Sequence, residues 1–180
     1  MSIALRRPVL DKAEAVARLH IACWQEAYAG IVPAEVLATS DLAERTAKWR
    51  QSIADPDSFV LAAFDDARPV ALVLARARNE PDAADGEGEI GALYVRASHY
   101  RLKLGTQLMA AAARWWLARG GRSLRLGVLT ENARAVAFYE RIGGRLVKAT
   151  TYSWGGADLP HLIYAFDDLA GLAASDAPEA

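Results

Sequence analysis

The spacing of apolar residues at the start of the chain predicts one short strand and two amphipathic helices. Residues 3–7 predict the strand, which should end at Pro8 because proline cannot donate a ladder hydrogen bond. Over residues 11–28 apolar side chains recur every three or four positions, so one helical face should pack on a sheet. Asp41, followed three residues later by a glutamate, predicts the N-cap of a second helix that runs to about Ser52.

The next part of the chain predicts an antiparallel hairpin and then an acidic loop. Residues 58–64 and 69–77 have the composition of strands and are joined by a short polar turn. Every position from Val70 to Ala75 is apolar, so we expect this strand to be covered on both faces. Residues 79–88 are rich in acidic side chains and predict a solvated loop.

The central region places a strand, a basic loop and a helix in direct succession. An apolar strand over residues 89–95 leads into a polar loop that starts at Arg96, and a helical segment follows through Met109. This order points backbone N–H groups and a helix N-terminus at an anion, which is the geometry of a phosphate cradle. Residues 123–128 predict a further strand, and residues 130–144 predict a turn, a capped helix and a glycine stop.

The end of the chain predicts two more strands and a tail. The strands should lie over residues 145–154 and 161–167, whereas the small and acidic residues after them predict a frayed end. With 180 residues, of which 53% are hydrophobic, the chain can build one well-buried core. We therefore expect an α/β fold with a single domain over residues 1–170 and a flexible tail over residues 171–180.

Composition argues against several classes of function. The formal net charge is −1 and basic residues are interleaved with acidic ones, so we expect no binding to nucleic acid. Cys23 is the single cysteine and the three histidines lack ligand spacing, so we expect no metal site. No leader and no apolar run of membrane-spanning length is evident, which favours a cytoplasmic protein without a membrane partner.

One motif after the strand at 123–128 identifies a family. The segment Glu-Asn-x-x-Ala-x-x-Phe-Tyr-x-x-x-Gly, which begins at Glu131, resembles the acyl-CoA-binding core of the GNAT superfamily of N-acetyltransferases. The order of elements over residues 3–167 also follows that family. The resemblance implies a mixed, mostly antiparallel central sheet of about seven strands with helices on both faces and a splayed central parallel pair. It also implies transfer of an acetyl group from acetyl-CoA to a primary amine of a small molecule or peptide, by direct attack in a ternary complex.

The resemblance assigns the cofactor, coenzyme A, to the central strand, the basic loop and the last helix. The implied binding residues are Leu93, Tyr94, Val95, Arg101, Leu102, Lys103, Leu104, Gly105, Thr106, Asn132 and Phe138. The family's loop motif, Gln/Arg-x-x-Gly-x-Gly/Ala, falls on Tyr100, Lys103 and Gly105, so only its last glycine is retained. A side chain in place of the first glycine strains the backbone if that residue must be left-handed. An alternative is therefore a degenerate domain that binds coenzyme A weakly, or not at all, and acts as a regulatory or interaction module.

The resemblance also implies catalytic residues. Tyr139 lies where the family places the tyrosine that donates a proton or a hydrogen bond to the departing sulfur, although a buried core tyrosine is the plainer interpretation. Glu89 opens the central strand at the place of the catalytic glutamate of histone-type members, but it also fits the end of a solvated loop. Other members carry a glutamate on the next strand, where this chain has Gly127. Glu26 and a water chain are further alternatives for the base.

The acyl-acceptor groove of the family lies beside the helices after the first strand. Candidate walls are Trp24, Glu26, Tyr28, Trp49 and Trp154, and core packing or, for Glu26, a solvated carboxylate is an equally good interpretation. The sequence does not name the acceptor amine, and a longer acyl-CoA is a third hypothesis. Exposed tryptophans at Trp115 and Trp116, or at Trp154, would favour a homodimer, because adjacent helical residues cannot face the same core.

Overall fold

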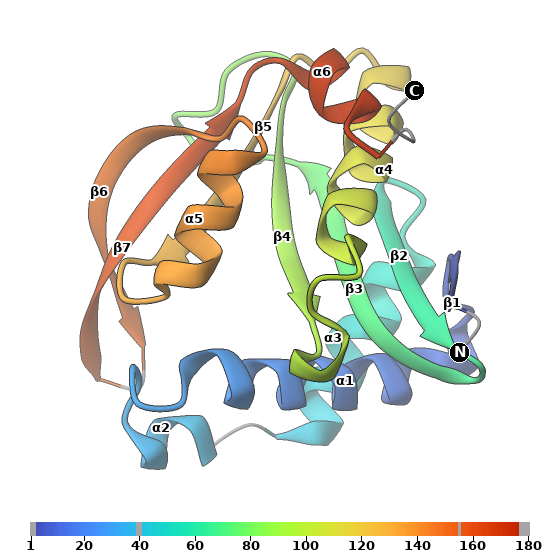
Figure 1. Cartoon of the computed structure of the whole chain (residues 1–180), viewed down its shortest axis with the longest axis vertical. Coiled ribbons are helices and arrows are strands. Elements are labelled where there is room, and N and C mark those ends of the chain that lie inside the picture. Colours follow the sequence, from blue (N-terminus) through green and yellow to red (C-terminus); the bar gives the residue numbers. More distant parts are fainter. Residues whose placement is uncertain (1–2, 39–40, 155, 177–180) are drawn as a thin grey trace.

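The computed structural model describes residues 3–38, 41–154 and 156–176, which include a seven-stranded sheet (Figure 1). The strand order is β1-β2-β3-β4-β5-β7-β6, and β4 and β5 are the one parallel pair. The strands are β1 (Ile3–Arg6), β2 (Ser58–Asp65), β3 (Arg68–Ala77), β4 (Glu87–Val95), β5 (Ser123–Leu129), β6 (Arg145–Trp154) and β7 (Ala157–Phe166). The expected mixed, mostly antiparallel sheet is confirmed.

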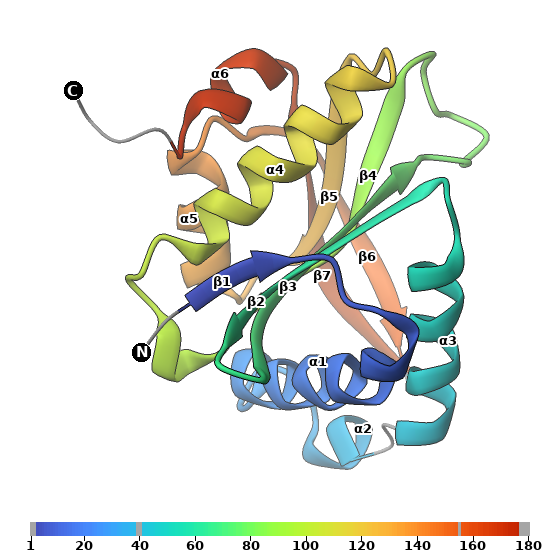
Figure 2. The same ribbon diagram turned by 90° about the vertical axis from the view of Figure 1, so that its right-hand side faces the viewer.

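Helices cover both faces of this sheet (Figure 2). One face carries α1 (Ala13–Tyr28), α2 (Ala34–Ala38) and α3 (Leu42–Ala54), and the other carries α4 (Leu104–Ala118), α5 (Ala133–Arg141) and α6 (Leu169–Ala174). Two short 3₁₀ turns, η1 (Leu10–Lys12) and η2 (Ala97–His99), precede α1 and α4. The helices thus form two outer layers around a central sheet, which is the arrangement expected for an α/β domain.

The helices of the first layer form where the sequence pattern predicts them. The apolar face of α1 is buried, with Val16 and Cys23 in the cluster under α1 and α3. Asp41 is the N-cap of α3, because its Oδ1 accepts hydrogen bonds from the backbone N–H groups of Ala43 at 2.7 Å and Glu44 at 3.1 Å. These bonds satisfy two N–H groups that a helix start would otherwise leave unpaired.

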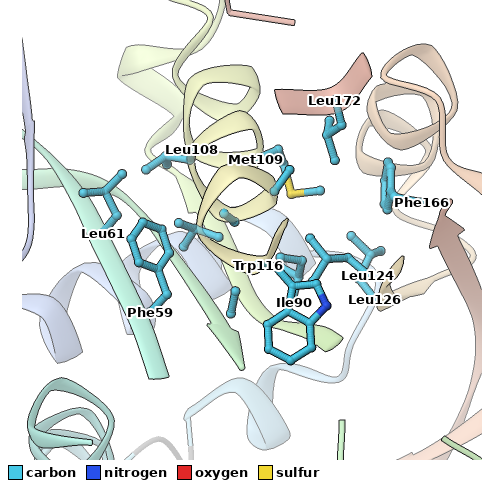
Figure 3. Close-up of a cluster of buried hydrophobic side chains, with 14 of the residues drawn as sticks. Phe59, Leu61, Ile90, Leu108, Met109, Trp116, Leu124, Leu126, Phe166 and Leu172 are labelled. Carbon is cyan, nitrogen blue, oxygen red and sulfur yellow. The ribbon is translucent and has the colours of Figure 1, made fainter. Parts of the chain in front are cut away.

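The strand β3 is buried on both faces, as its unbroken apolar run predicts. Val73 and Ala75 belong to the hydrophobic cluster under α4, whereas Leu72 and Leu74 belong to the cluster under α1 and α3. Figure 3 shows the first of these clusters, in which side chains from β2, β4 and β5 gather with Leu108, Met109 and Trp116 of α4. The two clusters together bury the centre of the sheet at β3 and β4 from both faces.

The strands β4 and β5 pair over a short stretch and then separate. Glu87–Glu89 pair with Ser123–Arg125, and β4 then has an unpaired residue at Gly91, between Ile90 and Ala92. Such a bulge bends a strand and ends regular pairing. The splayed parallel pair is therefore confirmed.

The closed end of this splay is held by a buried carboxylate. The side chain of Glu87 is 3% exposed, and its two oxygens form ion pairs with Arg78 at 2.8 Å and Arg125 at 2.9 Å. Because Arg78 directly follows β3 and Arg125 lies in β5, the three side chains tie three adjacent strands together at this end. The strands open only beyond this point.

The expected flexible tail is wrong for residues 171–176. Residues 169–174 form α6, whose Leu169 and Leu172 are 2% and 4% exposed and pack in the cluster under α4. Arg114 of α4 also forms an ion pair with Asp176 at 2.9 Å. Two buried leucines and this ion pair hold the segment against the domain, while residues 177–180 lie outside the described part.

The adjacent tryptophans of α4 are both accommodated within the chain. The indole N–H of Trp116 donates to the carbonyls of Gly86 at 3.1 Å and Ser123 at 3.0 Å, and Trp115 stacks on Phe59 at 5.3 Å. The premise that they are exposed is wrong, so the homodimer stays a prediction without this support. In the part of the chain that the structure describes, no helix is long and apolar enough to cross a membrane.

Candidate functional site

A cavity of about 850 Å³ opens where β4 and β5 separate. Leu104 of α4 and Tyr139 of α5 line it from one face of the sheet, and Cys23 and Tyr28 of α1 line it from the other. Because these helices lie on opposite faces, the cavity passes through the sheet. We call its part beside α4 and α5 the cradle side, and its part beside Cys23, Tyr28 and Tyr94 the α1 chamber.

The facing edges of β4 and β5 offer unpaired backbone to this cavity. Beyond Glu89, β4 continues to pair with β3 alone, and β5 beyond Arg125 pairs with β7 alone. The inner edges of both strands therefore present main-chain N–H and C=O groups, which an extended ligand carrying amides can bind as an added strand would. Leu93, Tyr94 and Val95, which the family resemblance assigns to cofactor binding, all line the cavity here.

The loop before α4 has the backbone of an anion cradle. Arg101 has φ 65° and Lys103 has φ 58°, both in the left-handed region. Left-handed backbone costs a side-chain-bearing residue about 1–2 kcal/mol, so the loop holds two strained residues immediately before the helix starts at Leu104. The first N–H groups of α4 have no partners within the helix and point out of its N-terminus, where an anion binds.

The retained glycine of this loop has a packing role. A Cβ at Gly105 would lie 3.0 Å from Cζ of Phe138, which is closer than side chains normally pack. Glycine at this position therefore lets α4 approach α5 closely, and it brings both predicted cofactor residues to the cavity wall. Lys103 and Thr106 line the same wall, whereas Leu102 does not line it and is 45% exposed.

The cradle side is positively charged. Arg101, Lys103, Arg134 and Arg141 line the cavity, and the guanidinium of Arg134 lies 3.9 Å from the ring centre of Tyr100. No aspartate or glutamate is found among the described residues that line it. A ligand with several phosphate charges is complementary to this wall.

Asn132 combines a structural and a binding position. Its Oδ1 accepts a hydrogen bond from the backbone N–H of Ala135 at 3.3 Å, which makes it the N-cap of α5. Its side chain also lines the cavity, so the amide NH₂ group is free to face a ligand while the oxygen caps the helix. Both interpretations of this residue are compatible with one geometry.

Tyr139 lies at the crossing between the two parts of the cavity. It is 8% exposed, lines the cavity, and its ring packs against Tyr164 and Phe166 at 6.3 and 6.5 Å between centroids. Burial, and secondarily Tyr28 across the sheet, raises the pKa of Tyr139 well above its ordinary value. The hydroxyl is therefore a proton or hydrogen-bond donor throughout the neutral range.

Glu89 is not brought together with Tyr139. It is absent from the cavity lining, and its Oε1 accepts a hydrogen bond from Nε of Arg76 at 2.6 Å. The pairing register places these two residues opposite each other on β3 and β4, at the closed end of the splay. Glu89, the predicted base, thus lies outside the cavity in an ion pair with Arg76.

The predicted acceptor-groove residues divide into one that lines the cavity and several that support it. Tyr28 lines the α1 chamber, and Trp24 lies behind it at 5.9 Å and contacts Trp154 at 3.8 Å between ring centroids. Glu26 does not line the cavity, because it forms an ion pair with Arg96 at 2.8 Å and accepts a hydrogen bond from the N–H of Ala97. Glu26 therefore fastens the loop before α4 to α1.

Trp49 belongs to the core rather than to the groove. It is 4% exposed, and its indole N–H donates to Nδ1 of His20 at 3.1 Å. Burial, with a smaller effect of Arg45, lowers the pKa of His20 to about 3, so this imidazole is neutral and can accept the bond. The His20 and Trp49 pair is a satisfied polar contact inside the cluster under α1 and α3.

Sequence reasoning missed several residues of the α1 chamber and its border. Cys23 and Ala27 line the chamber, and burial raises the pKa of the Cys23 thiol to about 12, which keeps it unreactive. His161 of β7 was set aside because it lacks metal-ligand spacing, yet its ring lies against Gly127. The helical spacing of Cys23, Ala27 and Tyr28 was the only sequence signal that could have grouped any of these residues.

A family model and a curated relative both match this chain over most of its length. A model described as the acetyltransferase (GNAT) family matches residues 13–144. The uncharacterized N-acetyltransferase YuaI of Bacillus subtilis (strain 168) is 23% identical over 176 residues, a match that covers 94% of this chain and 96% of the relative. The matched part includes the splayed strands, the basic loop and α5.

Solved structures share the fold across nearly the whole chain. The PaiA N-acetyltransferase of Thermoplasma acidophilum, in complex with coenzyme A, matches with a TM-score of 0.77 and 21% identity over 93% of this chain and 99% of that one. YncA of Salmonella typhimurium, solved with its cofactor acetyl-CoA, matches with a TM-score of 0.71 and 16% identity over 100% and 99%. The element order and the mixed sheet are therefore those of these proteins.

Proposed function

Because the chain belongs to the GNAT family of acetyltransferases, we propose that it transfers the acetyl group of acetyl-CoA to a primary amine of a small molecule or peptide. The amine attacks the thioester directly while both substrates are bound. The observation that carries this proposal is the single cavity through the sheet, which joins the basic cradle side to the α1 chamber. A donor entering from one face and an amine entering from the other meet between β4 and β5.

The cradle side fits coenzyme A. The first turn of α4 and the cations of Arg101 and Lys103 would hold the pyrophosphate, and the open edge of β4 at Leu93 and Val95 would pair with the amides of the pantetheine arm. Asn132 has a free amide NH₂ group for the same arm. When bound, acetyl-CoA supplies an acetyl group activated as a thioester.

Tyr139 is the residue that we assign to the departing sulfur. A thiol has an ordinary pKa of about 8.5, and that of Tyr139 is raised above 10, so complete proton transfer to the thiolate is unfavourable by roughly 2 kcal/mol or more. A hydrogen bond to the developing thiolate needs no such transfer and strengthens as negative charge accumulates. Tyr139 therefore stabilises the leaving group as a donor, and solvent protonates the thiolate on release.

The proposal is tested by calorimetric titration with acetyl-CoA and with CoA, followed by a screen of primary amines with detection of free thiol. We expect micromolar binding of both nucleotides and thiol release that depends on the amine. The screen should include an alkylamine, an arylalkylamine, a polyamine and a peptide N-terminus. Absence of binding at millimolar acetyl-CoA would contradict the proposal.

A second candidate is a domain that binds coenzyme A as a regulatory or interaction module without catalysis. The observation that favours it is the strained Lys103 in place of the family's glycine, because an altered cradle can retain affinity and lose the productive position of the thioester. Saturable binding of acetyl-CoA without thiol release for any amine would support this candidate over the first.

A further inference from the structure

We propose that His161 is the general base of the reaction, the group that takes the proton from the attacking amine. This inference rests on the proposed acetyl transfer. It concerns a residue on β7 that lies on the same face of the sheet as the α1 chamber. Figure 1 shows that β6 and β7 extend to the end of the molecule where α1 and α2 lie.

The position of the imidazole follows from a glycine on the neighbouring strand. A Cβ built at Gly127 would overlap the ring of His161, at 2.5 Å from Nε2, so the imidazole occupies the space that a side chain at 127 would fill. Gly127 itself lines the cavity at the inner edge of β5. The lack of a side chain there thus brings the imidazole to the edge of the cavity.

The contacts of His161 place it beside the α1 chamber. His161 pairs with Leu129 across β5 and β7, and Leu129 packs in the cluster that includes Tyr28 and Trp24. Tyr152 of β6 lies 5.5 Å from the imidazole between ring centroids, and Tyr152 also influences the ionisation of Tyr28. The base would therefore stand on the amine's side of the sheet, opposite the side on which α5 and Tyr139 lie.

Other groups that could serve as a base are already paired. Glu89 is bound to Arg76, and Glu26 is bound to Arg96 and Ala97. His99 lines the cavity, but its Nδ1 lies 2.8 Å from Oγ of Ser98 and its Nε2 lies 3.4 Å from Oδ2 of Asp65. In the described part of the chain, the titratable group in contact with the imidazole is the phenol of Tyr152, at 5.5 Å between ring centroids. Burial raises the pKa of the Tyr28 phenol in the neighbouring chamber, so Tyr28 cannot act as a base at neutral pH.

The imidazole is in the correct protonation state to accept a proton. Burial alone lowers the pKa of His161 below its ordinary value of 6.5, so the ring is neutral at pH 7 and becomes charged only as the pH falls through the lowered pKa. As the N–C bond forms, the attacking nitrogen loses a proton to the imidazole. The C–S bond breaks, and the thiolate departs with a hydrogen bond from Tyr139. The imidazolium then returns its proton to solvent.

The pH dependence of kcat/KM separates an enzymatic base from the ionisation of the amine. An alkylamine and an α-amino group differ in pKa by about 2.5 units, so a limb that belongs to the acceptor moves by that amount between them. We expect a second rising limb, below pH 6.5, that stays in place when the acceptor is changed. In His161→Gln this limb should be lost and kcat/KM at pH 7 should fall roughly 100-fold, a typical effect of removing a general base.

Two controls keep the test specific. The affinity of His161→Gln for acetyl-CoA should stay within about twofold of the wild type, which shows an intact fold, because the cradle side lies on the other face of the sheet. Tyr152→Phe keeps the ring beside His161 and should retain the limb. A limb that survives in His161→Gln, or disappears in Tyr152→Phe, would overturn the assignment. A wild-type protein without turnover on any amine would instead overturn the proposed acetyl transfer.

A double-mutant cycle tests the contact with Gly127. Gly127→Ala introduces the Cβ that overlaps the imidazole, so it should displace the ring and lower kcat/KM by roughly tenfold or more. If both substitutions act through the same imidazole, Gly127→Ala should cause almost no further loss in the His161→Gln background. Losses that simply add would show that activity does not depend on the imidazole held at Gly127.

Discussion

Replacing Lys103 with glycine should stabilise the protein while weakening its affinity for coenzyme A. Lys103 has φ 58°, a left-handed backbone that costs a side-chain-bearing residue about 1–2 kcal/mol. Glycine removes this cost but loses about 0.5–1 kcal/mol through its greater freedom in the unfolded chain, so the net gain should be about 0.5–1 kcal/mol. For a chain of this size that gain raises Tm by about 1–4 °C, which thermal unfolding monitored by circular dichroism detects.

The same substitution removes an ammonium group from the wall of the cradle side. A charge-assisted hydrogen bond to a phosphate contributes about 1.5 kcal/mol, so calorimetric Kd values for CoA should rise roughly tenfold. Lys103→Met is the matched control, because it removes the charge and retains the strain: its Kd should rise equally, without a gain in Tm. Tighter binding of CoA by Lys103→Gly than by the wild type would refute this reasoning, and would show that the lysine side chain obstructs the cradle.

Three further substitutions test other parts of the account. Tyr139→Phe should lower kcat for amine acetylation by roughly 10–100-fold in the thiol-release assay, because a single donor to the developing charge is lost. The Kd for CoA should stay within about twofold of the wild type. An unchanged kcat would exclude the role of Tyr139. Glu87→Gln should lower the free energy of unfolding, measured in urea, by about 2–4 kcal/mol, because Arg78 and Arg125 lose their buried partner. A loss below about 0.5 kcal/mol would contradict the role of Glu87 in holding β3, β4 and β5 together. Gly105→Ala should cost about 1–3 kcal/mol by crowding Phe138, and most of this loss should return in the double variant with Phe138→Leu, also measured in urea.

Most strands and helices followed from local patterns in the sequence. The helical spacing of apolar residues predicted α1, and Asp41 predicted the start of α3, because these signals act within a few residues of each other. The six-residue helix α6 could not be predicted in this way. It is too short to show a helical repeat of apolar residues, and it is held by contacts of Leu169 and Leu172 with residues on α4 that are distant in sequence.

The residues of the candidate site could be predicted where they lie on one helix. They were missed where their positions depend on the pairing of strands that are distant in sequence. The segment from Asn132 to Tyr139 is one helix, so its sequence spacing fixes which side chains reach the cavity. The ion pair of Glu89 with Arg76 depends on the register of β3 against β4. The approach of His161 to Gly127 likewise depends on the adjacency of β5 and β7, which no local pattern reveals.

The most direct test of the account is mass spectrometry of the acceptor after reaction with isotopically labelled acetyl-CoA. We predict that a primary amine gains one labelled acetyl group for each CoA thiol released, and that Tyr139→Phe reduces both products in parallel. Thiol release without a labelled amine would show hydrolysis instead of transfer. Bound acetyl-CoA that yields neither product with any amine would contradict the claim that this chain is an active acetyltransferase.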